Sequence, residues 1–150
     1  FLLERGGEIA ARGRHPSGRE WLMGIDSPDR QKIRRIVKWD GRALATSGNG
    51  VEGYNFAGRQ YGHVINPKTA MPVSDNTLQV SILAPSAMLG DGLATAALVM
   101  GPDRAPEMLK QFDASALFIM RDNDSPSIRE IDVLGFSKGL GARIFFYYRF

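Results

Sequence analysis

The hydrophobic pattern changes its period between Leu78 and Gly101, and this change constrains the fold more than any other feature of the sequence. The run LQVSILAP (78–85) is short, apolar and rich in β-branched residues, which predicts a buried strand. The run AMLGDGLATAALVMG (87–101) then carries apolar residues at helical spacing, after Ser86 as a candidate N-cap and up to Gly101 as a terminating glycine. A strand that feeds a helix in this way predicts a sheet with a helix packed on it.

The rest of the chain adds strands on both sides of this unit and a second, short helix, APEMLKQF (105–112). NGVEGYNFAGRQYG (49–62) is rich in glycine and predicts a loop or an irregular hairpin. The sequence therefore predicts an α+β fold, with a mixed, mostly antiparallel sheet and helices packed on one side. The further strands are expected within 1–11, 20–26, 32–48, 114–120 and 127–136.

Composition narrows the function classes. The 150 residues, 43% hydrophobic and 23% charged, suit one globular domain. The chain has no cysteine, which excludes disulfides, zinc–thiolate sites and thiol nucleophiles. Its net charge of +3 fits either an anionic ligand or a solvated basic surface. The chain begins without Met, inside an expected strand and with no visible signal peptide, so we expect a piece of a longer protein.

A basic cluster raises the possibility of nucleic-acid binding, but the pattern argues against it. Only Trp39 lies near the four cations, whereas single-stranded nucleic acid needs interleaved aromatic side chains for stacking. We therefore expect a solvated strand face and no nucleic-acid partner. The cluster consists of Lys32, Arg34, Arg35 and Lys38.

Asp91 and Thr95 form the sharpest local constellation. In a helix their i, i+4 spacing places a carboxylate and a hydroxyl on one face, and such hard oxygen donors suit Mg²⁺ or Ca²⁺. Gly90 and Gly92 flank the aspartate, which is easier to explain if backbone must approach a ligand. The alternative is an aspartate in the first helical turn, favoured by the helix dipole, beside an incidental threonine.

His63 stands in an apolar setting directly before an Asn-Pro-Lys-Thr turn. Its imidazole could act as a general base, because histidine titrates near neutrality. Pro67 stiffens the turn and biases Asn66 towards extended geometry, as holding a catalytic side chain requires. A half-buried histidine bonded to a backbone carbonyl is the alternative.

Two glycine-containing segments could approach a ligand. ATSGNGVEGY (45–54) ends a strand with hydroxyls and backbone N–H groups that could hold a phosphate or a pyrimidine-like edge, although a simple loop is the default interpretation. Gly6, Gly7 and Glu8 could mark a flavin or nucleotide approach point, or a β-bulge. Neither segment is a P-loop or a dinucleotide fingerprint.

Taken together and in order, these segments resemble the ApbE family of FAD:protein FMN transferases, once called thiamine-biosynthesis lipoproteins. The resemblance covers residues 3–101 closely and the tail only loosely, with no counterpart here of the family's N-terminal half. It implies that residues 1–150 are the C-terminal portion of one ApbE-like, T-fold-like domain, with residues 136–150 unassigned. The segments that carry it are ERGGEIAARG, WLMGIDSP, ALATSGNGVEGY, YGHVINPKTAMPV and VSILAPSAMLGDGLATAALVMG.

The resemblance also implies chemistry. ApbE proteins bind FAD and a divalent cation (Mg²⁺ or Ca²⁺) and attach FMN through a phosphoester to a threonine or serine of an acceptor flavoprotein, such as a subunit of a membrane redox complex, at the periplasmic face of the cell envelope. Asp91 and Thr95 match the metal ligands, and His63 matches the histidine that helps to deprotonate the acceptor hydroxyl. The expected cofactor-binding residues are Gly7, Glu8, Thr46, Ser47, Gly48, His63, Asn66 and Thr69.

Ala70 departs from this pattern, because ApbE proteins usually have glycine after the threonine. If that position needs a positive φ, alanine is costly there. Two other functions remain open beside FMN transfer. One is an FAD pyrophosphatase that gives FMN and AMP, and the other is a non-catalytic FAD-binding remnant.

Overall fold

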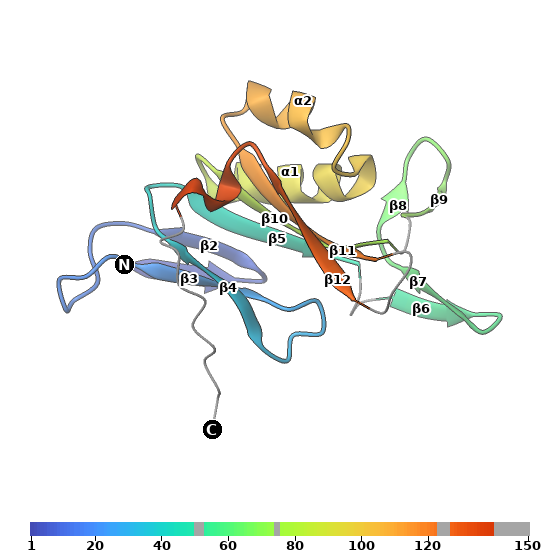
Figure 1. The fold of residues 1–150 in the computed structure, drawn as a ribbon, viewed down its shortest axis with the longest axis horizontal. Helices are drawn as coiled ribbons and strands as arrows, with labels where there is room; N and C mark the ends of the chain where they lie inside the picture. The colour runs from blue at the N-terminus through green and yellow to red at the C-terminus, as the bar shows by residue number, and fades with distance from the viewer. Residues whose placement is uncertain (50–52, 74–75, 123–126, 140–150) are drawn as a thin grey trace.

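The chain folds around one antiparallel sheet with the strand order β1-β2-β5-β10-β11-β12 (Figure 1). A computed structural model describes residues 1–49, 53–73, 76–122 and 127–139. Every neighbouring pair of these six strands is antiparallel, which confirms the predicted α+β class. The strands are β1 (Leu2–Arg5), β2 (Glu8–Ala11), β5 (Ala43–Gly48), β10 (Thr77–Ala84), β11 (Ser115–Arg121) and β12 (Ile128–Val133).

Helices α1 (Ala87–Met100) and α2 (Ala105–Gln111) cover one face of the sheet, at the top of Figure 1. The predicted caps of α1 are confirmed: the Ser86 hydroxyl accepts a hydrogen bond from Leu89 N at 3.3 Å, and Gly101 ends the helix with φ of +77°. The core between helices and sheet is aliphatic with one large aromatic ring, and it includes Val80, Ile82, Leu93, Leu98, Leu109 and Phe118.

The hairpin of β3 (Leu22–Asp26) and β4 (Ile33–Lys38) covers the opposite face, together with a 3₁₀ turn at Phe136–Gly139 (Figure 1). This second core explains the continuous apolar run in β10. Both faces of β10 are buried, so apolar and polar residues do not alternate along it. The core contains Met23, Ile25, Val37, Leu44, Leu83, Leu117 and Phe136.

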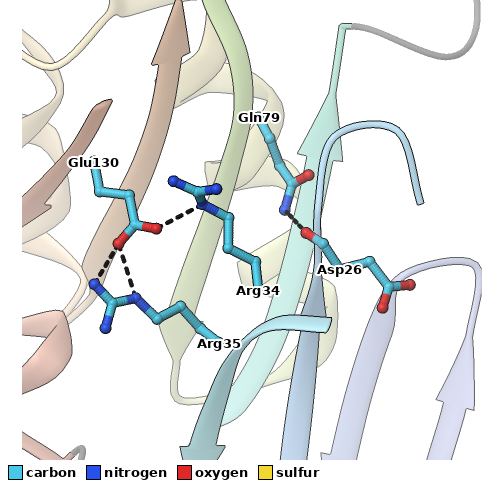
Figure 2. A network of polar contacts seen from close by, with 5 residues as sticks. All are labelled: Asp26, Arg34, Arg35, Gln79 and Glu130. Atoms are coloured by element: carbon cyan, nitrogen blue, oxygen red, sulfur yellow. Dashed lines mark hydrogen bonds and ion pairs between the residues drawn. The ribbon is translucent and has the colours of Figure 1, made fainter. Parts of the chain in front are cut away.

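The basic cluster on β4 is not simply a solvated face. Arg34 Nε donates to Glu130 Oε1 at 2.6 Å, and Arg35 Nε donates to Glu130 Oε2 at 2.8 Å (Figure 2). Glu130 lies on β12, so these half-buried ion pairs tie the hairpin to the edge of the main sheet. The expectation of a solvated strand face is therefore wrong for these two arginines, because the hairpin folds back over the sheet.

Two small hairpins lie beside one end of the sheet, at the right of Figure 1. The segment expected to be a loop or an irregular hairpin contains a regular one, in which Tyr54 pairs with Tyr61 and their rings stack at 5.6 Å. Residues 50–52 of that segment, the turn at 123–126 and the tail from 140 onwards lie outside the described residues. No described helix is long and apolar enough to cross a membrane. The hairpin strands are β6 (Gly53–Phe56), β7 (Arg59–Gly62), β8 (Ile65–Asn66) and β9 (Met71–Pro72).

Candidate active site

A cavity of about 870 Å³ lies where β5 extends beyond the end of β2. The β2–β5 ladder stops at Ala45, whereas the β5–β10 ladder continues to Gly48. Among the described strands, none pairs with the outer edge of β5 after Ala45, so the backbone of Thr46–Gly48 stays available on that side. The cavity lies against this edge and is also lined by the β1–β2 turn, the end of β3, helix α1 and the segment between β7 and β8.

The turn between β1 and β2 forms one wall. Arg5 pairs with Glu8, so Gly6 and Gly7 are the whole loop, and their φ angles are +68° and +108°. A Cβ at Gly7 would lie 3.2 Å from the carbonyl oxygen of Thr46, so glycine lets this turn approach β5 closely. The glycine pair is thus a tight hairpin turn and not a bulge. Gly7 and Glu8 both line the cavity.

Hydroxyl groups at the end of β5 reach the cavity on both faces of the sheet, because consecutive strand residues point to opposite sides. Thr46 Oγ1 lies 2.9 Å from Ser81 Oγ on the face covered by the β3–β4 hairpin. Ser47 Oγ lies 3.0 Å from Thr95 Oγ1 on the face covered by the helices. Thr46, Ser47 and Gly48 all line the cavity, so the structure brings these predicted residues together.

Asp91 and Thr95 line the cavity from helix α1, and both are exposed. The helix begins at Ala87 and has no acidic residue in its first turn, so the helix dipole does not explain Asp91. Among the residues that the structure describes, none forms a hydrogen bond or an ion pair with the Asp91 side chain. This leaves a carboxylate and a hydroxyl, one turn apart, directed to the same cavity.

The two glycines beside Asp91 have different surroundings. A Cβ at Gly90 would lie 3.0 Å from the Cβ of Ala45, so Gly90 allows α1 to pack closely on β5. This packing, and not a ligand, accounts for Gly90. A Cβ at Gly92 would meet nothing within 4 Å. Nothing in the structure explains why Gly92 is not alanine.

His63 lies between β7 and β8, is exposed and lines the cavity. This exposure contradicts the half-buried position in the alternative of a histidine bonded to a backbone carbonyl. His63 enters the cavity from the small hairpins, whereas Asp91 and Thr95 enter from α1. Residues far apart in the sequence thus share one cavity, as a base beside an ion site would require.

Asn66 and Thr69 build the turn after His63 and do not line the cavity. Asn66 Oδ1 accepts a hydrogen bond from Lys68 N at 3.0 Å, and Thr69 Oγ1 accepts one from Met71 N at 3.3 Å. Both side chains therefore satisfy backbone groups of the β8–β9 turn. The structure does not bring these two predicted cofactor-binding residues to the other six. Ala70 closes the turn at φ of +55°, the left-handed region in which alanine is strained.

Sequence reasoning missed several polar residues on the cavity wall. Gln79 is 5% exposed, and its Nε2 donates to the backbone oxygen of Asp26 at 3.0 Å (Figure 2). Asp26, Ser27 and Arg30 also line the cavity, at the end of β3. Gln79 could have been noticed because it is a polar residue inside the apolar run 78–85. A buried amide there needs a hydrogen-bond partner from another segment. No local pattern marked Arg30, which has φ of +56°.

The turn that carries Arg30 is held by a network of hydrogen bonds. Ser27 N donates to Lys32 O at 2.8 Å, and Arg30 N donates to Ser27 O at 2.7 Å. The Ser27 hydroxyl also donates to the carboxylate of Asp29, which accepts a second bond from Gln31 N. These two hydrogen bonds, the first being the stronger influence, lower the pKa of Asp29 below its ordinary value.

Comparison with known proteins identifies the family. The family model described as "ApbE family" matches residues 1–118. The chain belongs to the ApbE family. Among curated ApbE relatives, the FAD:protein FMN transferase of Salmonella typhimurium is 31% identical over 126 residues, which are 83% of this chain and 36% of the relative. That of Vibrio cholerae is 32% identical over 126 residues, 83% of this chain and 38% of the relative.

Solved ApbE structures share the fold. The apo form of Pseudomonas stutzeri flavinyl transferase ApbE superposes with a TM-score of 0.74 at 30% identity, covering 95% of this chain and 44% of that one. The flavin transferase ApbE of Vibrio cholerae gives the same TM-score and identity over 93% of this chain and 44% of that one. The chain therefore spans about a third of its curated ApbE relatives and less than half of these solved structures.

Proposed function

We propose that the protein containing this chain transfers FMN from FAD to a threonine or serine hydroxyl of an acceptor flavoprotein. The observation that carries the proposal is the single cavity shared by the β5 hydroxyls, His63, Asp91 and Thr95. Membership of the ApbE family and the names of the relatives, FAD:protein FMN transferases, give the reaction class. The cavity volume of about 870 Å³ lies within the usual range for small-molecule sites.

The residues present fit a Mg²⁺ ion at Asp91 and Thr95. Their oxygens are the hard ligands that this ion prefers, and the helix sets them one turn apart. Among the described residues there is no cluster of three or more His, Cys, Asp or Glu side chains that could hold a metal ion. That agrees with the usual Mg²⁺ site, which takes one or two carboxylates and leaves the other positions to water and substrate phosphates. When bound, the ion would neutralise charge on the diphosphate of FAD.

The chain's own residues would perform the remaining steps. Hydroxyls of Thr46 and Ser47 and the free edge of β5 would orient the phosphates. The oxygen of the acceptor hydroxyl would attack the phosphorus of the FMN half of FAD, and His63 would accept the proton of that hydroxyl. The bond from that phosphorus to the bridging oxygen breaks, AMP leaves, and FMN remains on the acceptor as a phosphoester.

The test uses the full-length protein, FAD, Mg²⁺ and candidate acceptor flavoproteins. We expect covalent flavin fluorescence on an acceptor, lost with EDTA and lost in Asp91→Asn. Asp103→Asn is the matched control, because Asp103 is an exposed carboxylate outside the cavity. Failure of the wild-type protein to label any acceptor that carries the threonine or serine contradicts the proposal.

A second function is hydrolysis of FAD to FMN and AMP. It is favoured by one observation: His63 is exposed, so water can reach the base. Product analysis without an acceptor separates the two reactions, because only a hydrolase releases FMN and AMP steadily under those conditions. FAD binding that survives EDTA, without either product, would instead indicate a non-catalytic remnant.

We also propose a location. The family resemblance supports a lipoprotein that faces the periplasm at the bacterial cell envelope, where subunits of membrane redox complexes would be its acceptors. A lipoprotein signal in the upstream reading frame and cleavage by protease added to spheroplasts would support this location. Retention of the full-length protein in the cytoplasm would contradict it.

A further inference from the structure

Asn49 lies where the end of β5 meets the segment that carries His63. Its backbone N donates to Leu78 O at 2.9 Å, which continues the β5–β10 ladder past Gly48. Its side-chain Nδ2 donates to Val73 O at 3.4 Å. Oδ1 is buried and has no hydrogen-bond partner among the described residues. The carboxamide is therefore held between the main sheet and the small hairpins.

Gly62, directly before His63, packs against this carboxamide. A Cβ at Gly62 would lie 1.5 Å from Asn49 Oδ1 and 2.4 Å from its Cγ, so only glycine fits while Asn49 is present. On the other side of His63, the carbonyl oxygen of Val64 accepts a hydrogen bond from Val73 N at 2.9 Å. Both neighbours of His63 are thus fixed, one by Asn49 and the other by Val73, which Asn49 also binds.

We propose that Asn49 is a positioning residue that holds His63 at the cavity. The inference rests on the proposed function in that it takes His63 as the base. The backbone on either side of His63 sets where its imidazole can reach, so contacts that fix this backbone also position the base. Loss of the Asn49 side chain frees Gly62, and a base displaced by about 1 Å can slow a reaction on the order of a hundredfold.

The experiment measures covalent FMN labelling by the full-length protein, with FAD, Mg²⁺ and the acceptor that the wild type labels. Asn49→Ala is expected to slow labelling about tenfold or more, with FAD affinity unchanged. Asn55→Ala is the matched control, because Asn55 is an exposed asparagine on β6 outside the cavity. Asn49→Ser loses the same carboxamide and replaces Asn49→Ala if that variant does not fold.

The contact with Gly62 gives a sharper test. Gly62→Ala alone is expected to impair labelling, because the new Cβ collides with the carboxamide. Combining Gly62→Ala with Asn49→Ala removes the three atoms nearest to that Cβ, so the double variant should label faster than Gly62→Ala. A double variant slower than Gly62→Ala, or an Asn49→Ala that labels at the wild-type rate, overturns the proposal.

An NMR readout separates this inference from the proposed function. The Cε1 signal of His63 should shift or broaden in Asn49→Ala, whereas that of His15, which pairs with Ser17 at 2.8 Å, should not change. An unchanged His63 signal refutes the positioning role even if transfer occurs. A changed signal in a protein that labels no acceptor refutes the proposed function and leaves the positioning role standing.

Discussion

Replacing Ala70 with glycine should stabilise the protein, although the substitution removes a methyl group. Ala70 is exposed and has φ of +55°, so its Cβ buries no surface and strains the backbone. The left-handed conformation costs an L-residue about 1–2 kcal/mol. Glycine would offset about 0.4–1 kcal/mol of this gain, because it increases the conformational entropy of the unfolded chain. The hydrogen bond from the residue 70 N–H to Asn66 O, 2.9 Å long, is available to either residue.

The expected net gain is about 0.5–1 kcal/mol in the free energy of unfolding. Urea titration of the full-length protein measures it, and amide exchange at residues 66–72 shows whether the gain is local. Ala57, in the two-residue turn between β6 and β7, has φ of +50°, so Ala57→Gly should shift stability in the same direction. Ala96→Gly is the opposite control, because Ala96 is helical and should lose about 1 kcal/mol. Destabilisation by Ala70→Gly comparable to that of Ala96→Gly would refute the strain argument.

Three further predictions follow from the site. Gly92→Ala should stabilise α1 by about 1 kcal/mol, whereas Gly90→Ala should destabilise the protein, because only Gly90 packs against β5; thermal unfolding compares the two. Ser47→Ala should weaken Mg²⁺-dependent FAD binding about tenfold in calorimetry, since it frees the Thr95 hydroxyl; unchanged Mg²⁺ dependence would contradict the link. Because hydrogen bonds lower the pKa of Asp29, their stabilisation exists above the ordinary carboxyl pKa and is lost as pH falls through the lower folded value. The protection of amide hydrogens in this turn, relative to their intrinsic exchange rates, should therefore fall only below about pH 4, and this fall should be absent in Asp29→Asn.

The central part of the fold could be predicted because its signals are local. The strand of the run 78–85, its successor helix and both helix caps depend on residues within a few positions of one another. The same holds for the second helix and for the last strand pair. Hydrophobic period and capping chemistry act over such distances, so one sequence is enough to read them.

Contacts between distant segments could not be read in this way. Arg34 and Arg35 pair with Glu130, which lies 96 and 95 residues away, and no local pattern indicates that the β3–β4 hairpin folds over the sheet. The bond from Gln79 to Asp26 spans 53 residues and was missed for the same reason. From one sequence, a charged strand face is therefore predicted to be solvated, because the segment that contacts it is not known.

The same distinction between local signals and distant contacts applies to the candidate site. Each predicted residue stood in a recognisable local motif, but the motif did not say which of its side chains faces the cavity. Asn66 and Thr69 share a motif with His63, yet their side chains hold the turn. Asn49 stands in the TSGN run and looked like part of a loop. Its role depends on Gly62 and Val73, which become its neighbours only after folding.

The cavity itself results from a mismatch in strand length. Strand β2 begins only after the Gly6–Gly7 turn, at Glu8, which pairs with Ala45 of β5. Strand β5 continues past this pair for three more residues, Thr46 to Gly48. A longer β2 would pair with that edge and satisfy its backbone groups, which would leave no polar edge for a phosphate. A shorter β5 would remove the Ser47 hydroxyl from its place beside Thr95. The position of the turn and the length of β5 therefore act together, because both are needed to expose polar backbone of β5 next to α1.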